Sequence, residues 1–147
     1  MLISIIALIV SIAGFLLSIV THFQILRRDR KQATLEAYNR LESEALEKLD
    51  MMMPAEINII VENSRTKEYS SQYKELTALV ARIEHFCVGV ESGIYDKKVV
   101  YELGHGFLDD RIMKRIEPLI DMKDHGASKS YYENTRKVVA EMKKMSR

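Results

Sequence analysis

The sequence predicts an all-α protein in which a single N-terminal transmembrane helix is followed by a small antiparallel helical bundle. The 147-residue chain contains no Asp, Glu, Lys or Arg before position 27. Beyond that point apolar residues recur every three to four positions, strong helix formers dominate, and no segment of useful length shows the alternation of a strand. We therefore expect a transmembrane anchor at residues 1–26, a basic juxtamembrane segment at 27–31 and a cytoplasmic helical bundle at 32–147.

The apolar segment is typical of a membrane span that stays attached. Thirteen of the nineteen residues from 2 to 20 are Leu, Ile, Val or Phe. About 20 such residues, each rising ~1.5 Å, cross a hydrocarbon core ~30 Å thick. A cleaved signal peptide would instead carry a basic first region, an apolar stretch of about 7–15 residues and a cleavage site between small residues. We therefore predict a single-pass protein of the cell membrane.

Positive charge is concentrated on one side of this segment. The basic residues that follow it at once are Arg27, Arg28, Arg30 and Lys31. Basic flanks tend to stay in the cytoplasm, which places the N-terminus outside the cell and the C-terminal domain inside. The single cysteine, Cys87, agrees with a reducing compartment because it has no partner for an internal disulfide. Whether the four basic residues bind anionic lipid headgroups or only stop translocation stays open.

Small and hydroxyl-bearing residues of the span recur at intervals of three and four. They are Ser4, Ala7, Ser11, Gly14, Ser18 and Thr21. Helices associate in lipid through faces of small residues, and a repeat that averages 3.5 residues favours a left-handed crossing. We therefore expect this packing face to pair with another transmembrane helix, most simply a second copy of the chain. Chance placement in a monomeric anchor is the alternative.

Periodicity and proline indicate the first two helices of the bundle. Residues 32–50 carry apolar side chains at the spacing of an amphipathic helix. This helix either continues the membrane helix or bends near the basic cluster, since no Gly or Pro separates the two. Pro54 suits the first turn of a second helix, which would bury Ile57 and Ile60. The polar residues 63–71 then predict a loop.

The strongest helical pattern lies between this loop and Gly93. Its apolar residues follow an unbroken spacing of three and four: Tyr73, Leu76, Val80, Ile83, Cys87 and Val90. Gly93 supplies the C-terminal stop, and Asp96 is the expected N-cap of a short helix that Gly104 and Gly106 weaken.

Two further helices complete the predicted bundle. The first turns Ile112, Ile116, Leu119 and Ile120 inward, and Pro118 should kink or split it. Ser130 is the expected cap of the last helix, which places Tyr131, Val138 and Met142 on one side.

Few residues form a pattern typical of a catalytic or metal-binding site. Glu102 and His105 stand three apart and Asp109 follows one turn later, but di-metal bundles need two Glu-x-x-His pairs and further carboxylates. We therefore expect no metal and no cofactor, and interpret this group as a solvated helix end. Cys87 faces the predicted core and is expected to be an inert thiol.

Charged residues outside the basic cluster suggest structural roles. Glu84 borders the buried stripe of the long helix and is expected to pair with a basic residue such as Arg111 or Lys114. The net charge is +1, and basic residues alternate with acidic ones without interleaved aromatics, so we expect no nucleic-acid partner.

Two functional hypotheses fit these observations best. The first is a membrane-anchored helical scaffold or interaction module, without catalytic activity of its own, that recruits an unknown cytoplasmic protein. The alternative is an oligomerising, membrane-disrupting effector of the defence or toxin type. A membrane-tethered enzyme that uses Glu102, His105 and Asp109 is a third hypothesis with less support.

Residues 76–140 resemble a family of small bacterial proteins catalogued as a domain of unknown function. The resembling stretches are "IEHF", "VGVESGIYD", "IEPLI" and "YYENTRKVV", and Lys123 is the nearest match to a basic residue that often follows the third stretch. The resemblance implies a helical fold, a bacterial membrane setting and often an N-terminal transmembrane helix. It implies no activity and no catalytic residues.

Overall fold

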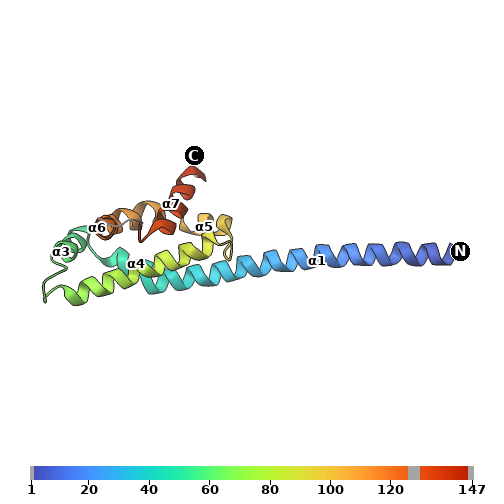
Figure 1. Cartoon of the computed structure of the whole chain (residues 1–147), viewed down its shortest axis with the longest axis horizontal. Coiled ribbons are helices and arrows are strands. Elements are labelled where there is room, and N and C mark those ends of the chain that lie inside the picture. The colour runs from blue at the N-terminus through green and yellow to red at the C-terminus, as the bar shows by residue number, and fades with distance from the viewer. Residues whose placement is uncertain (1, 126–129, 146–147) are drawn as a thin grey trace.

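The computed structural model describes residues 2–125 and 130–145, and these residues form helices and turns without any strand. The helices are α1 (Leu2–Leu41), α2 (Glu47–Met51), α3 (Pro54–Glu62), α4 (Ser70–Glu91), α5 (Lys97–Gly104), α6 (Met113–Asp124) and α7 (Glu133–Met145). Two π-helical turns, η1 (Glu42–Leu46) and η2 (Phe107–Ile112), precede α2 and α6. Figure 1 shows α1 as a long rod whose N-terminal part projects from the bundle that its C-terminal part forms with the other helices. The predicted all-α fold is confirmed.

The first helix continues without interruption from the apolar segment into the bundle. Leu41 and Leu46 keep helical backbone angles where α1, η1 and α2 join, so one rod runs from residue 2 to residue 51. At ~1.5 Å per residue, this rod is about 75 Å long. It ends at Met52, and Met53 is extended because the ring of Pro54 disfavours a helical residue before it. No bend occurs at the basic cluster.

The bundle is built around the antiparallel pair of the α1 end and α4. Their contacts run in opposite directions along the two helices: Arg82 pairs with Glu44, the Phe86 ring meets Tyr38, and the Asp96 amide bonds to Thr34. Helix α7 packs on α4, α6 packs on α3, and α5 packs on α1. The largest fully buried side chains are Leu46, Leu49, Ile57, Ile60, Leu76, Ile83, Leu108, Ile112, Ile116, Leu119 and Ile120.

Of the two outcomes expected at Pro118, a kink or a split, the split is wrong, because α6 continues through the proline. The helix runs from Met113 to Asp124 with the proline inside it. A proline removes one backbone hydrogen bond and crowds the carbonyl four residues earlier. The neighbouring Ile116, Leu119 and Ile120 are buried, and this burial favours the continuous helix over an interrupted one.

Asp96 caps α5 as predicted, while α7 begins differently. The Asp96 carboxylate accepts hydrogen bonds from the amides of Lys98 and Val99, at 3.0 and 3.2 Å. Ser130 lies before the first turn of α7, and its hydroxyl accepts from the amide of Tyr132 at 3.2 Å. The amides of Asn134 and Thr135 in the first turn of α7 instead donate to the carboxylate of Glu84 in α4.

Candidate functional site

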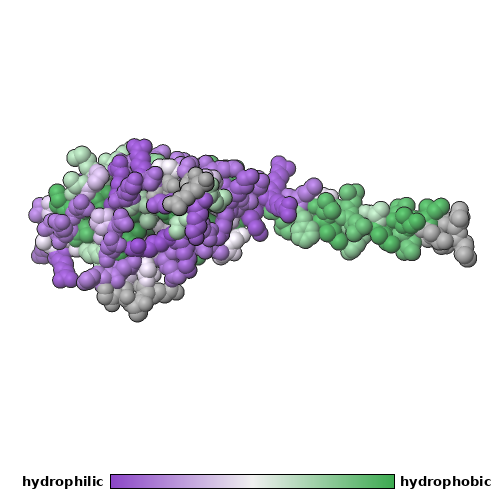
Figure 2. Space-filling model, turned by 90° about the horizontal axis from the view of Figure 1, so that it is seen from above, coloured by the Kyte–Doolittle hydropathy of each residue, from purple (hydrophilic) through white to green (hydrophobic). Residues whose placement is uncertain are grey.

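Residues 6–26 of α1 form an apolar arm that contacts no other described part of the molecule. Thirteen large apolar side chains between Ile6 and Leu26 are exposed, and the most apolar window of this helix is entirely unburied. Figure 2 shows the arm as an apolar projection from a largely hydrophilic body. Within the described residues, one helix is long and apolar enough to cross a membrane. Soluble monomers seldom expose apolar surface of this extent.

Small residues leave a hollow along one face of the arm. It has a volume of about 450 Å³ and is lined by Gly14, Leu17, Ser18, Thr21, His22 and Ile25. A Cβ atom added at Gly14 would meet nothing within 4 Å. The hydroxyls of Ser11 and Thr21 donate to carbonyls one turn earlier, each at 2.9 Å, so they are satisfied without water. The side chain of Ser4 lies outside the described residues.

A basic hollow lies where the arm meets the bundle. Its volume is about 370 Å³, and it is lined by Arg27, Arg30, Lys31, Asp96, Lys98, Val99 and Glu102. Three of the four predicted basic residues therefore share one face with α5, while Arg28 does not line the hollow. The sequence alone does not indicate Lys98, because its proximity to Arg27 depends on how α5 packs against α1.

Buried Thr34 fixes α5 beside the basic segment. Its hydroxyl donates to the carbonyl of Arg30 at 2.7 Å and accepts from the amide of Asp96 at 2.8 Å. The Thr34 side chain thus joins the basic turn of α1 to Asp96, the N-cap residue of α5. This pair of hydrogen bonds, together with the packing of α5 on α1, sets the relative position of Arg30 and Lys98.

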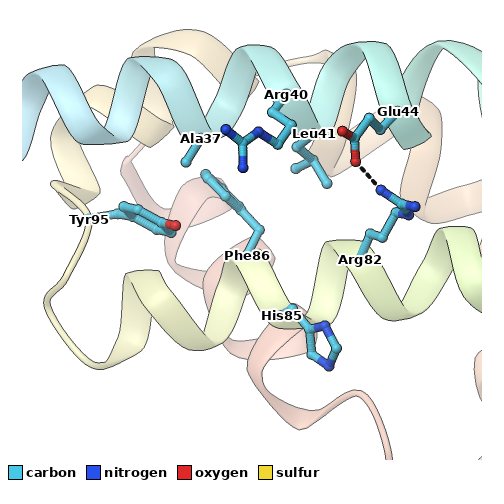
Figure 3. Close-up of a pocket in the computed structure, with 8 residues that line it drawn as sticks. All are labelled: Ala37, Arg40, Leu41, Glu44, Arg82, His85, Phe86 and Tyr95. Atoms are coloured by element: carbon cyan, nitrogen blue, oxygen red, sulfur yellow. Dashed lines mark hydrogen bonds and ion pairs between the residues drawn. The ribbon is translucent and has the colours of Figure 1, made fainter.

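A third hollow, also of about 370 Å³, lies between α1, η1 and α4, and Figure 3 shows its lining. Glu44 and Arg82 form an ion pair across one end. At the other end the Tyr95 ring stacks on Phe86, with ring centres 5.1 Å apart. Gly89 makes room for this stack, because an added Cβ would lie 2.4 Å from the Tyr95 ring. The ion pair joins η1 to α4, and the ring stack fixes the loop after α4 against that helix.

Glu84 binds the start of α7 instead of a basic residue. One of its carboxylate oxygens accepts from the amide and the side chain of Asn134, at 3.2 and 2.7 Å. The other accepts from the amide and the hydroxyl of Thr135, at 2.8 and 2.6 Å. The first amides of a helix lack partners within the helix and attract a negative charge. The predicted pairing of Glu84 with Arg111 or Lys114 is therefore wrong.

The basic residues expected near Glu84 bind other acids. Arg111 and Arg115 approach one oxygen of Asp50 at 2.6 and 3.3 Å, and Lys114 lies 3.4 Å from Asp110. The Asp50 pairs join the end of the long rod to η2 and α6.

Burial keeps two further titratable groups in their neutral forms. Desolvation raises the pKa of Cys87 to about 12, against a smaller lowering by its hydrogen bond with Thr135. Desolvation, with a smaller contribution from Glu42, likewise raises the pKa of Tyr38 to about 12, and its hydroxyl donates to the carbonyl of Leu103 at 3.3 Å. Both groups hold their protons at neutral pH, so Cys87 is a thiol and not a nucleophilic thiolate.

The residues of the third hypothesis do not assemble into a described site. Glu102 lies 3.9 Å from Lys98, and the His105 ring packs against Tyr101 with ring centres 5.3 Å apart. The side chain of Asp109 lies outside the described residues. Within the part that the structure describes, no three or more His, Cys, Asp and Glu side chains are grouped to hold a metal ion.

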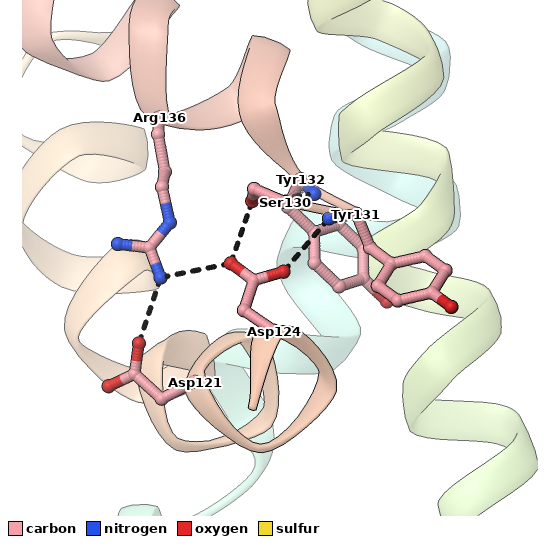
Figure 4. Close-up of polar contacts among 6 residues, drawn as sticks. All are labelled: Asp121, Asp124, Ser130, Tyr131, Tyr132 and Arg136. Carbon is pink, nitrogen blue, oxygen red and sulfur yellow. Dashed lines mark hydrogen bonds and ion pairs between the residues drawn. The ribbon is translucent and has the colours of Figure 1, made fainter. Parts of the chain in front are cut away.

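Asp124 joins α6 to α7, as Figure 4 shows. Its carboxylate accepts from the Ser130 hydroxyl at 2.7 Å and from the Tyr131 amide at 2.8 Å. Arg136 lies 2.8 Å from Asp121 and 3.4 Å from Asp124. Partial desolvation raises the pKa of Asp124, but these hydrogen bonds and the charge of Arg136 outweigh it, so the pKa lies below its usual value. The cluster is a structural link between two helices.

Comparison with known proteins shows the family of the chain. Residues 1–142 match the family described as Domain of unknown function (DUF4760), so the chain belongs to it. The match extends beyond residues 76–140, which carry the resembling stretches, and includes the apolar arm. Lys123, the basic residue noted in that resemblance, lies over the ring of Tyr73 at 5.2 Å. No curated protein and no solved structure matches the chain.

Proposed function

We propose that this member of the DUF4760 family is a membrane-anchored helical scaffold that holds its bundle against the inner surface of a bacterial cell membrane. The observation that carries the proposal is the unbroken rod from residue 2 to residue 51, apolar and exposed at one end and built into the bundle core at the other. A bilayer is the most favourable environment for an apolar helix of this length. In water, apolar side chains on every side of the helix would stay in contact with the solvent.

The spacing along α1 supports a bundle that lies directly at the membrane surface. Residues 27–33 separate the apolar arm from Thr34, the first buried residue of the helix. Seven residues at ~1.5 Å each span about 10 Å, slightly more than the thickness of one headgroup layer, about 5–8 Å. Because the helix is continuous, a tilt of the arm turns the bundle by the same angle. The basic residues after the arm favour a cytoplasmic bundle.

The bundle acts as an interaction module and not as a catalyst. Its half-buried acids Asp50, Glu84 and Asp124 are engaged in contacts that join helices. A scaffold needs such fixed links, because its partner must meet one defined surface. The proposed cytoplasmic partner is a protein that binds the surface of this rigid bundle.

A second copy of the chain is the proposed partner of the packing face. The hollow around Gly14 gives a neighbouring helix room for close approach, which drives association in lipid. Oxidative crosslinking of full-length chains in membranes tests this, with Gly14→Cys compared with Phe15→Cys. We expect more dimer from Gly14→Cys, and equal yields would contradict the pairing. Buried Cys87 stays unreactive in both variants.

The same hollow favours one alternative function, an oligomerising effector that disrupts the membrane. Membrane potential, followed with a voltage-sensitive dye in bacteria that express the full chain, separates the two functions. The scaffold leaves the potential unchanged in the wild type and in Gly14→Ile at matched membrane levels. Depolarisation by the wild type but not by Gly14→Ile would contradict the scaffold and identify the packing face as the active part of an effector.

A further inference from the structure

We propose that the basic hollow between α1 and α5 binds the phosphate group of an anionic phospholipid. This inference rests on the proposed membrane anchoring and adds a specific lipid site to it. The site is formed by Arg27, Arg30 and Lys31 of α1 together with Lys98 of α5.

The charges that line the hollow are unbalanced. Four basic and two acidic side chains face it, and both acids already have partners. Asp96 caps α5 through the amides of Lys98 and Val99, and Glu102 lies 3.9 Å from Lys98.

The α1 cations are left without such partners. Arg27, Arg30 and Lys31 have no ion-pair partner among the residues whose side chains the structure describes. Like charges this close repel one another, and an anion between them removes that repulsion. A phosphate suits the place, since guanidinium groups bind it through paired hydrogen bonds and ammonium groups bind it as point charges.

The position of the hollow selects a lipid phosphate as the occupant. Arg27 is the first charged residue after the apolar arm, and Lys31 lies about one helical turn further along. When the arm spans the bilayer, these residues lie at the depth of the headgroup phosphates. The hollow is about 370 Å³ in volume, enough for a headgroup but not for a whole lipid, whose acyl chains would lie along the arm.

A folded site differs from general attraction between basic residues and an anionic surface. General attraction depends on the number of charges at a given depth. The hollow instead requires Lys98, which Thr34 and Asp96 bring to α1, and it excludes Arg28 although Arg28 lies at nearly the same depth as Arg27.

Native mass spectrometry of the full chain in detergent tests the site. The chain is titrated with phosphatidylglycerol and, separately, with zwitterionic phosphatidylcholine. We expect tighter binding of the anionic lipid, and a loss of about fivefold in Lys98→Gln, the ratio that corresponds to one basic contact of ~1 kcal/mol. Lys114→Gln is the matched control. Both lysines are similarly exposed, at 76% and 73%, and each pairs with an acid one turn away.

A second pair of variants separates the site from diffuse attraction. Arg27→Gln should weaken binding of phosphatidylglycerol about fivefold, and Arg28→Gln should leave it nearly unchanged. Equal losses in Arg27→Gln and Arg28→Gln, or equal effects in Lys98→Gln and Lys114→Gln, would overturn the proposal. So would equal binding of the two lipids by the wild type.

Inorganic phosphate distinguishes the source of the anion. We expect millimolar phosphate to leave the bound phosphatidylglycerol in place, because the acyl chains also contact the arm. Displacement by phosphate at that concentration would overturn the lipid assignment in favour of a free phosphate site. The detergent format does not depend on insertion into a bilayer, so failure here is distinguishable from failure of the anchoring proposal.

Discussion

At the scale of single residues, the bundle depends on a few acids that bind helix ends or basic side chains of another element. Glu84 of α4 binds the first turn of α7 through four hydrogen bonds, and Asp124 of α6 binds the segment before α7 through Ser130 and Tyr131. Asp50 at the end of the rod binds Arg111 and Arg115. These contacts determine how the short helices are oriented, because short helices have little stability of their own.

Removal of the Glu84 carboxylate should destabilise the bundle strongly. We expect Glu84→Ala to lower the free energy of unfolding by about 2–4 kcal/mol, because it leaves two helix amides and two side-chain donors unpaired. Glu84→Gln should cost roughly half as much, since its amide oxygen still accepts. Chemical denaturation of the full chain in detergent, followed by the near-UV circular dichroism of tyrosine, measures both.

Glu75→Gln, on an exposed position of the same helix, is the control for Glu84 and should change stability by less than about 0.5 kcal/mol. Similar losses at positions 75 and 84 would contradict the assigned role of Glu84.

The contribution of Asp124 to the stability of the folded state should disappear in acid. Its pKa is lowered in the folded chain from an ordinary value of 3.8, so the folded state favours the carboxylate. The resulting stability is fully present above pH 3.8 and is lost as the pH falls through the folded pKa. The Tm difference between the wild type and Asp124→Asn should therefore be constant from pH 7 to about pH 5 and shrink below pH 3.8. A difference that persists unchanged at the lowest pH would show that charge is not its source.

At the scale of elements, α4 is the helix around which the bundle is arranged. One side of it meets the end of α1, and another carries Glu84 and the buried residues that pack on α7. Its C-terminal end turns sharply: the carbonyl of Gly89 accepts from the amides of Ile94 and Tyr95, at 3.0 and 3.1 Å. This turn returns the Tyr95 ring onto Phe86 and delivers Asp96 to Thr34.

Gly89→Ala should disturb this turn. The added methyl group would lie 2.4 Å from the Tyr95 ring, so we expect a loss of about 1–3 kcal/mol in the free energy of unfolding and a changed near-UV tyrosine signal. Gly104→Ala is the comparison, because its methyl group meets the flexible end of Met142 at 2.9 Å. A smaller effect is expected there, and an equal or larger one would contradict the packing argument.

At the scale of the whole molecule, the spacing of apolar residues in the sequence predicted where the helices lie better than it predicted which residues of distant helices meet. The stripe from Leu76 to Val90 is buried as expected, because a helix has one face and the sequence repeats with its period. The partner of Glu84 and the proximity of Lys98 to Arg27 were missed, since both depend on how distant segments pack. The π-helical turns also have no clear signal in the sequence.

The candidate site was therefore predictable only in part. The basic residues after the arm stand out in the sequence because no charge precedes them. The hollow that three of them share with Lys98 exists only in the folded chain, where α5 packs on α1 and Thr34 bonds to Asp96. The pairing of the packing face with a second helix stays a prediction.

Alkaline carbonate extraction of membranes from cells that express the full chain tests the central claim, that the apolar arm spans the bilayer. Ile12→Arg/Leu16→Arg places two charges in the arm at a cost of about 6 kcal/mol, and Met51→Arg/Met53→Arg places two on exposed positions of the bundle end. We expect the wild type and the Met51/Met53 variant to stay with the membranes, and the Ile12/Leu16 variant to be released. Release of the wild type into the soluble fraction would contradict the anchor and the scaffold built on it.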